Sequence, residues 1–312
     1  MSPVRTVFLG TPDFAAHILD RLLASQQVQV AAVFTQPDRF GGRGKKRLEP
    51  PVKKLASQHG VPVFQPERLD RESVEELQRI GPDALTVAAY GQILPAEILN
   101  VANLGAINVH ASLLPRYRGA APIQWALLNG DSVTGVTTMR MEQGMDSGPI
   151  LEQRALAIGV EDTAGTLHDE LAQMGASLLL STLTRLAAGN LVPVAQDPNQ
   201  ISYAPKLGKE VRHIDWNQSA QKIHNTIRAL HPSPGAYCYL RKSAEDALLR
   251  VRLFPGEPGE EVARAGPGEV LGLDSRERLG FACRDRVYWI PAVQPESGKP
   301  LAARDFYNGY LA

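Results

Sequence analysis

The chain has 312 residues, which is long for one compact domain of about 150 residues, so we expect two domains. Its hydrophobic content of 44% and charged content of 21% exclude disordered, collagen-like and simple coiled-coil chains. No segment approaches the roughly 18 apolar residues that a membrane-spanning helix needs, and the first residues lack the pattern of a secretory signal. We therefore expect a cytoplasmic protein with no membrane partner.

The charge is unevenly distributed along the chain. The formal net charge is zero, from 33 basic and 33 acidic residues, and a neutral average does not favour a nucleic-acid partner. Residues 39–54, however, carry seven basic side chains and one acidic one, whereas the rest of residues 1–208 has a net charge of −8. Most charged runs are solvated loops, but a glycine-rich basic arm on an acidic body is also typical of a segment that orders on a polyanion.

Residues 1–194 alternate strand and helix signals, which predicts a Rossmann-like, mostly parallel α/β sheet with helices on both faces. Apolar runs predict strands at residues 4–9, 28–34, 61–64, 84–89, 106–110, 136–141 and 150–158. Amphipathic segments predict helices at 12–23, 52–59, 73–80, 95–100, 122–128 and 166–188. Residues 41–51 have no apolar period and predict a long loop, the core of a basic insertion at about 39–54.

The last third of the chain has a different pattern. Residues 195–208 contain Pro198 and Pro205 without an apolar period and predict a linker. Residues 209–312 predict a helix at 219–230 and then five short strands, at 236–241, 249–254, 268–274, 279–283 and 287–291. Short strands between glycine and proline turns, with one helix, are compatible with a small OB-like β-barrel. We expect this barrel to form the second domain.

Cysteine chemistry is not expected. The only two cysteines in the sequence, Cys238 and Cys283, lie in apolar, strand-like surroundings that favour buried, inert thiols. Two cysteines are too few for a disulfide framework or a zinc site. We therefore expect no metal.

The turn after the first predicted strand, Gly10-Thr11-Pro12-Asp13-Phe14, lies where a dinucleotide-binding protein carries Gly-x-Gly-x-x-Gly. It has one of the three glycines, and Pro12 and Phe14 fill space that a pyrophosphate would need. We interpret the turn as ordinary strand-to-helix capping, and a nicotinamide cofactor is not favoured.

Polar residues interrupt the predicted strand at 106–110 near its carboxyl end. Asn108 and His110 are two residues apart, so their side chains lie on one face, about 6.6 Å apart along the strand. In open α/β sheets that end of the strands is where ligands bind. A hydrogen-bonded core histidine beside a loop-capping asparagine remains an alternative interpretation.

A carboxylate follows in the glycine-rich turn Gln143-Gly144-Met145-Asp146-Ser147-Gly148, between two predicted strands. An Asp in such a turn often serves only the turn itself. If Asp146 meets Asn108 and His110 at one sheet edge, the three supply an amide donor, an acid/base and an orienting carboxylate. These groups suit acyl transfer without a covalent nucleophile.

The run NVHASLLP at 108–115, with residues 135–141 and 144–148, resembles the signature of the formyltetrahydrofolate-dependent formyltransferases. Further segments resemble the branch of this family that acts on methionine carried by initiator tRNA. These segments are LGTPDFA at 9–15, GRGKK at 42–46 leading into PVK at 51–53, YGQILP at 90–95, and RYRGAAPIQ at 116–124. The resemblance covers about the first 150 residues in order, and the last hundred match only in size and strand pattern.

The resemblance implies transfer of a formyl group from 10-formyltetrahydrofolate to the α-amine of initiator methionyl-tRNA, for translation initiation. It implies that Asn108, His110 and Asp146 are catalytic: Asn108 and His110 donate to the oxyanion, and Asp146 orients the imidazole and accepts the proton of the amine. It also implies a folate site formed by the residues Ser112, Leu113, Leu114, Pro115, Tyr90, Gly91, Gln92, Ile93, Leu94 and Gln143.

The basic insertion is implied to enter the acceptor arm of the tRNA, with contacts from Arg43, Lys45, Lys46 and Arg47. A second basic face on the barrel is expected from Arg228, Arg241, Lys242, Arg250 and Arg252. We expect the protein to act as a monomer.

Two alternative functions remain open. A formyltransferase of the same fold that acts on a small amine, such as an amino sugar nucleotide, would need neither the basic insertion nor the barrel. A non-catalytic RNA-binding protein would not need Asn108, His110 and Asp146 together.

Overall fold

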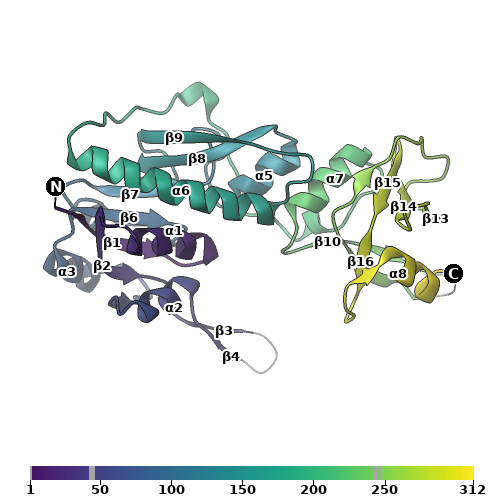
Figure 1. Ribbon diagram of the computed structural model, residues 1–312, viewed down its shortest axis with the longest axis horizontal. Helices are drawn as coiled ribbons and strands as arrows, with labels where there is room; N and C mark the ends of the chain where they lie inside the picture. The colour runs from purple at the N-terminus through teal and green to yellow at the C-terminus, as the bar shows by residue number, and fades with distance from the viewer. Residues whose placement is uncertain (1, 42–45, 242–244, 246) are drawn as a thin grey trace. The chain divides into compact units, whose positions relative to one another are not determined.

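The chain folds into two compact units (Figure 1). The computed structural model describes residues 2–41, 46–241, 245 and 247–312. The N-terminal unit comprises Met1–Pro122, Val133–Ala157 and His168–Ala204, and the C-terminal unit comprises Ile123–Ser132, Ile158–Leu167 and Pro205–Ala312. The expected domain limits, 1–194 and 209–312 around a linker at 195–208, remain a prediction.

The N-terminal unit is built on a seven-stranded sheet of order β5-β2-β1-β6-β7-β8-β9. The strands are β1 (Val4–Gly10), β2 (Val28–Phe34), β5 (Val63–Phe64), β6 (Ala84–Ala88), β7 (Ala106–His110), β8 (Val133–Arg140) and β9 (Ile150–Ala157). Strands β5, β2, β1, β6 and β7 are parallel, while β8 and β9 are antiparallel at one edge. The predicted mostly parallel sheet is confirmed.

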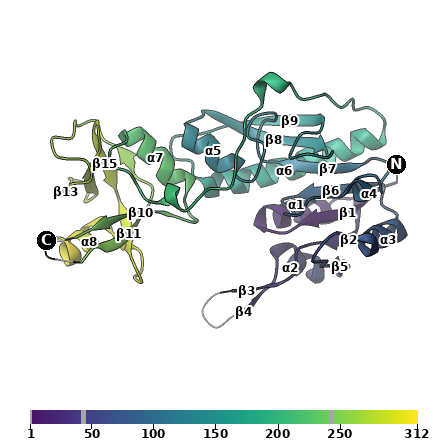
Figure 2. The same ribbon diagram turned by 180° about the vertical axis from the view of Figure 1, so that it is seen from behind.

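Helices cover both faces of this sheet, so every residue of β6 and β7 is buried, as the continuous apolar runs predicted. Figures 1 and 2 show α1 (Asp13–Leu23) and α6 (Ala164–Ala187) on one face. On the other face, α3 (Arg71–Ile80) and α4 (Ala96–Leu99) contribute Leu77 and Ile98 to a shared apolar core. Gly175 lets α6 approach β7 closely, because a Cβ there would lie 2.7 Å from Cγ1 of Val109.

Helix ends follow local sequence signals. Asp70 caps α3 by accepting a hydrogen bond from the Ser73 N–H at 3.1 Å, and the helix ends at Gly81, whose φ is +62°. Helix α2 (Pro51–Gln58) begins with proline, which has no N–H to leave unpaired in the first turn. The remaining helical segments are α5 (Pro122–Asn129), α7 (Ala220–Ala229), α8 (Ala303–Tyr310) and the short 3₁₀ turns Pro198–Gln200 and Glu210–Arg212.

The C-terminal unit contains two four-stranded antiparallel sheets, β10-β11-β16-β17 and β12-β15-β14-β13. Their strands are β10 (Ala236–Leu240), β11 (Leu249–Leu253), β12 (Glu257–Pro258), β13 (Val270–Leu273), β14 (Leu279–Ala282), β15 (Val287–Ile290), β16 (Ala292–Pro295) and β17 (Leu301–Ala302). One apolar core joins both sheets to α7 and α8 through residues such as Ile227, Phe281 and Phe306. The antiparallel C-terminal β domain agrees with the predicted fold class.

Three details of the sequence-based prediction were wrong. The described part of the C-terminal unit has eight strands where five were expected, because β12 and β17 are two residues long and β16 follows β15 after a single residue. Helix α8 was missed because its eight residues include Gly309 and only Ala303 and Phe306 are buried. The expected loop at 41–51 includes part of a hairpin, β3 (Arg39–Gly41) with β4 (Lys46–Leu48).

This hairpin has no apolar face to bury, which explains why no period marks it. Phe40 and Leu48 are both exposed, and the two strands pair through their backbones. The middle of the expected loop, residues 42–45, lies outside the described residues.

Candidate active site

Asn108 and His110 lie on β7, beside β8 in the register Asn108–Met139 and His110–Thr137. Both side chains are buried, with exposed fractions of 8% and 6%. Within the described residues the Asn108 carboxamide has no hydrogen-bond partner, and it is not among the fully enclosed polar groups that lack one, so its amide remains accessible to a small molecule. A buried amide with unused donors is suited to binding an oxygen of another molecule.

The imidazole of His110 is held by one of its two nitrogens. Nε2 donates a hydrogen bond to the Tyr117 carbonyl oxygen at 2.9 Å, which fixes the proton on that nitrogen. Nδ1 faces the Asp146 carboxylate, with 3.6 Å between Nδ1 and Oδ2. The predicted pairing of His110 with Asp146 is therefore present, and Nδ1 is the nitrogen that remains for other partners.

Asp146 is held in an unusual backbone conformation within the β8–β9 turn. Its φ is +49°, a left-handed value that Asp tolerates better than most residues. Its Oδ2 accepts a hydrogen bond from the Gly119 N–H at 2.8 Å. The carboxylate thus connects its own turn to the loop after β7.

Gln196 braces this turn, and the sequence-based prediction missed it. Its Nε2 donates to the Asp146 carbonyl at 2.8 Å and the Gly148 carbonyl at 2.7 Å. Its Oε1 accepts from Nε and Nη2 of Arg118, at 3.0 and 2.7 Å. Gln196 lies in the segment expected to be a linker, where no periodic signal marked it.

The same segment also supports the loop after β7. Ser202 Oγ accepts from the Tyr117 N–H at 2.9 Å, and the Ser202 carbonyl accepts from the Arg118 N–H at 2.9 Å. The Ala204 N–H donates to the Arg118 carbonyl at 2.7 Å. Residues 202–204 therefore help hold the backbone that carries the carbonyl partner of His110.

The Ser112–Pro115 loop is fixed from β8 and β9. Thr137 Oγ1 donates to the Ser112 carbonyl at 2.7 Å and accepts from the Leu114 N–H at 3.1 Å. Gln153 Nε2 donates to Thr137 Oγ1 at 2.9 Å and to the Leu114 carbonyl at 2.8 Å. Thr137 and Gln153 are further positioning residues that the sequence did not single out.

The Tyr90–Leu94 segment follows β6 and is packed tightly against Gln36. Gln36 Nε2 donates to the carbonyls of Tyr90 and Gly91, each at 3.1 Å. The side chains of Tyr90 and Leu94 belong to the apolar core with α3 and α4, whereas Ile93 is exposed. Burial raises the pKa of Tyr90 to about 12, and its hydroxyl has no partner in the described part of the chain.

Gln92 and Gln143, two other expected folate residues, lie in different surroundings. Gln92 Nε2 donates to the Pro66 carbonyl at 3.2 Å. Gln143 lines a cavity of about 620 Å³ together with Ala106 and Arg140. The described lining of this cavity does not include the Tyr90–Leu94 segment or the Ser112–Pro115 loop, so the cavity does not bring Gln143 together with the other expected folate residues.

The basic insertion is anchored at its base by Asp38. The Asp38 carboxylate binds Nζ of Lys53 at 2.7 Å and Nε of Arg47 at 2.5 Å, and Gln65 donates to it at 2.8 Å. The hydrogen bonds from Gln65 and Lys53 lower the Asp38 pKa to about 2. Arg47 is thus paired within the chain, although its side chain is 64% exposed. Of the other predicted contacts, Arg43, Lys45 and the side chain of Lys46 lie outside the described residues.

The expected basic face of the barrel is only partly present. Arg228 is 5% exposed, and its guanidinium donates to the Gly159 carbonyl at 2.9 Å and to Asn225 Oδ1 at 3.1 Å. Its place on that face was predicted wrongly, because this side of α7 packs against residues 158–162. Arg250 and Arg252 lie on β11, and Lys242 lies outside the described residues.

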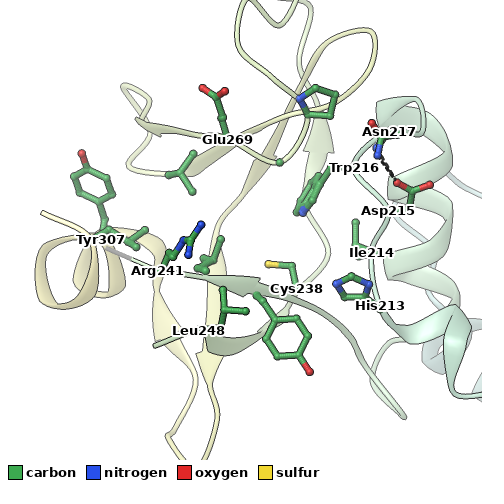
Figure 3. Close-up of a pocket in the computed structure, with 16 residues that line it drawn as sticks. His213, Ile214, Asp215, Trp216, Asn217, Cys238, Arg241, Leu248, Glu269 and Tyr307 are labelled. Carbon is green, nitrogen blue, oxygen red and sulfur yellow. Dashed lines mark hydrogen bonds between the residues drawn. The ribbon is translucent and has the colours of Figure 1, made fainter. Parts of the chain in front are cut away.

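The two cysteines are buried and free, as predicted. Burial raises the pKa of each thiol to about 12. Cys238 lies at a cavity of about 890 Å³ in the C-terminal unit, which Figure 3 shows with Cys238, Trp216 and His213 among its lining residues. Such thiols do not ionise near neutral pH.

The described residues contain neither a metal-ion site nor a membrane-spanning helix. Among them no group of three or more His, Cys, Asp and Glu side chains is placed to hold a metal ion. No helix in the part of the chain that the structure describes is long and apolar enough to cross a membrane.

The chain that carries Asn108, His110 and Asp146 also matches a known protein family in its sequence. Residues 4–183 match the sequence profile of the formyl transferases, and residues 206–311 match that of the formyl transferase C-terminal domain. The chain therefore belongs to the formyl transferase family.

Full-length relatives narrow this assignment. The chain is 46% identical to the methionyl-tRNA formyltransferase of Nitratidesulfovibrio vulgaris, over 100% of this chain and 94% of that protein. It is 44% identical to the methionyl-tRNA formyltransferase of Caldanaerobacter subterraneus, over 98% of this chain and 97% of that protein. Within the family, the chain belongs with the methionyl-tRNA formyltransferases.

Solved structures with the same fold are more distant in sequence. An N-formyltransferase from Helicobacter canadensis, in complex with folinic acid and dTDP-3-aminofucose, superposes with a TM-score of 0.67 at 20% identity. The match covers 92% of this chain and 98% of that one. HypX from Aquifex aeolicus, in complex with tetrahydrofolic acid, gives 0.65 at 19% identity over 99% of this chain and 48% of that one.

Proposed function

We propose that this enzyme transfers the formyl group of 10-formyltetrahydrofolate to the α-amine of methionine on initiator tRNA. The observation that carries the proposal is the approach of the Asp146 carboxylate to His110, two residues along β7 from Asn108, in a chain whose full-length relatives are methionyl-tRNA formyltransferases. A cytoplasmic location and a monomeric state are part of the proposal.

Formyl transfer needs donors for a developing oxyanion and an acceptor for the amine proton. As the amine nitrogen bonds to the formyl carbon, the carbonyl oxygen gains negative charge, which the Asn108 amide and a protonated His110 Nδ1 stabilise. Asp146 orients the imidazole and accepts the proton that the amine loses, directly or through water. The bond between the formyl carbon and its former nitrogen then breaks, and that nitrogen takes up a proton.

The geometry supports Nδ1 as the acting nitrogen of His110. Nε2 already donates to the Tyr117 carbonyl, while Nδ1 lies beyond a normal hydrogen bond from Asp146, at 3.6 Å. A proton on Nδ1 therefore has room to be shared between the carboxylate and a reacting oxygen.

A folate co-substrate supplies the activated formyl group, and the residues present fit it. The Asn108 carboxamide is the buried, unpartnered group that its formyl oxygen would use. We assign the pterin to the Ser112–Pro115 loop, which Thr137 and Gln153 fix, and to the Tyr90–Leu94 segment, which Gln36 holds. Gln143 is assigned to the same substrate.

The tRNA is the source of the amine, and we assign two regions to it. Arg43, Lys45 and Lys46 of the basic insertion bind its acceptor end, with Arg47 at the base of the hairpin. The C-terminal unit, through its arginines, binds its backbone.

The direct test is to mix the protein with 10-formyltetrahydrofolate and methionyl-tRNA, either initiator or elongator. Formylation of the initiator alone supports the proposal. Activity on an amino sugar nucleotide and none on either tRNA would replace it with the small-amine alternative.

The roles of the site residues need a matched control. Asn108→Ala is expected to lower kcat by about 100-fold, the usual cost of one lost oxyanion donor. His110→Gln should lower it at least as much. His168→Gln is the control, because His168 also pairs with an aspartate, Asp169, at 2.8 Å but lies on α6. Full activity of Asn108→Ala, or equal losses in the control, contradicts these roles.

A further inference from the structure

The outer face of β10 and β11 carries an unusual set of side chains. Strand alternation turns Cys238 and Val251 into the core, so the neighbouring positions face outward. Those positions pair across the strands as Tyr237 with Arg252 and Tyr239 with Arg250. We call these four residues, Tyr237, Tyr239, Arg250 and Arg252, the tyrosine face.

Three aromatic rings meet on the tyrosine face. The Tyr237 and Tyr239 ring centroids are 5.7 Å apart in an edge-on arrangement, and His213 lies 5.5 Å from Tyr237 and 5.6 Å from Tyr239. Tyr239 is 47% exposed, so about half of its side chain is open to solvent. The cluster therefore presents ring surface to solvent.

The charge beside these rings is positive. A groove of about 210 Å³ is lined by Tyr237, the arginines Arg212, Arg250 and Arg252, and, as the one carboxylate among its described lining residues, Glu296. The guanidinium carbon of Arg250 lies 4.0 Å from the centroid of the Tyr237 ring. Its Nη1 is 3.9 Å from Oε1 of Glu296, a long and partly exposed ion pair that contributes little. Arg212 and Arg252 bond to backbone carbonyls, and no carboxylate of the described residues pairs with either guanidinium.

The rings also border the large cavity of the C-terminal unit. His213 and Tyr239 line it together with Trp216 and Tyr307. In Figure 3, Arg241 and Tyr307 lie on one side of this space and Asp215 and Asn217 on the other. Aromatic walls with polar side chains between them suit a flat heterocycle with hydrogen-bonding edges.

We propose that the tyrosine face binds an unpaired nucleotide of the tRNA, with its base stacked on Tyr239 and its phosphate beside Arg250. Exposed aromatic rings next to arginines on a barrel strand are the elements that recognise single-stranded nucleic acid, because bases stack on the rings while phosphates meet the cations. The inference rests on the proposed tRNA substrate and adds to it a contact with a base.

The binding test uses uncharged initiator tRNA, so it does not depend on formyl transfer. Tyr239→Ala is expected to weaken binding by about tenfold, the usual effect of one lost stacking ring, and Tyr239→Phe should retain wild-type affinity. Thermal unfolding of Tyr239→Phe should match the wild type, and Tyr239→Ala should remain folded at the assay temperature, because about half of the Tyr239 side chain is already exposed. Wild-type affinity in Tyr239→Ala, or an equal loss in Tyr239→Phe, overturns the proposal.

Salt dependence separates the phosphate contact from the stacked base. Arg250→Gln should reduce the slope of log affinity against log salt by about one, whereas Tyr239→Ala should leave the slope unchanged. Arg276→Gln is the matched control, since Arg276 is also exposed and pairs with one glutamate, Glu257, at 3.6 Å. Equal slopes for Arg250→Gln and Arg276→Gln contradict the phosphate contact.

The two proposals fail in different ways. If the wild type does not formylate methionyl-tRNA, the proposed function falls. If the wild type formylates methionyl-tRNA but Tyr239→Ala has the same affinity and the same KM for initiator tRNA, only the proposal for the tyrosine face is wrong.

Discussion

Replacing Gln196 with alanine should impair catalysis although Gln196 is not expected to touch the substrate. The amide of Gln196 donates to the carbonyls of Asp146 and Gly148 and accepts two bonds from Arg118. It therefore holds the turn that aims the Asp146 carboxylate at His110. Asp146 has a left-handed backbone, so the turn without its brace is free to relax toward a less strained conformation.

The magnitude follows from the bonds that are lost. Two bonds to carbonyls contribute about 1 kcal/mol each, and bonds from a charged donor about 1.5–3 kcal/mol. Gln196 is half-buried, so water can replace some of the lost hydrogen bonds. We therefore expect Gln196→Ala to lower the free energy of unfolding by about 2 kcal/mol. A displacement of Asp146 by an ångström is enough to lower kcat by about 100-fold, so activity should suffer more than stability.

Gln196→Glu provides a sharper test than truncation. Its carboxylate keeps the pairing with Arg118 but places an oxygen against the carbonyls of Asp146 and Gly148, which repel it. We expect Gln196→Glu to lose at least as much kcat as Gln196→Ala in steady-state formylation, with folate affinity nearly unchanged. Wild-type kcat in Gln196→Glu, measured on protein that is fully folded by thermal unfolding, would refute the bracing role.

Other predictions concern stability. Thr137→Val leaves the Leu114 N–H without its partner and should lower the unfolding free energy by about 1–3 kcal/mol, measured by denaturant titration, and raise the KM for folate. The folded-state pKa of Asp38 is about 2, below the ordinary 3.8, so the stability advantage of the wild type over Asp38→Asn should shrink as pH falls from about 4 to about 2. Burial lowers the His224 pKa below 6.5, so the free energy of unfolding should fall as pH drops below about 6.5. The fall should be smaller in His224→Gln. Thermal unfolding measured over a pH series checks the Asp38 and the His224 predictions.

The elements that carry the site could be predicted from the sequence because their signals are local. Strand β7 was expected at 106–110 and lies there, since its five consecutive buried positions are apolar except for Asn108 and His110. The turn around Asp146 was marked by its glycines, of which Gly144 has a φ of +128° and cannot accept a side chain without strain. Local chemistry thus identified both halves of the His110–Asp146 pair.

The bracing residues could not be predicted in the same way. Gln196, Ser202 and Gln153 act through hydrogen bonds to backbone groups that are far away in the sequence, and a polar side chain in a segment without a period carries no trace of its partner. Arg228 shows the converse error, because a cation on an amphipathic helix was expected at the surface but is buried against backbone carbonyls.

The segment expected to be a linker, residues 195–208, also helps to hold the candidate active site. A linker that only connects two domains should tolerate insertion and truncation, because its backbone makes few contacts. Residues 196–204 instead hold both the Asp146 turn and the loop whose carbonyl fixes the His110 proton. The chain that leads out of the N-terminal unit is thus part of the structure that orients the catalytic groups. Insertions within it should lower kcat before they affect tRNA affinity.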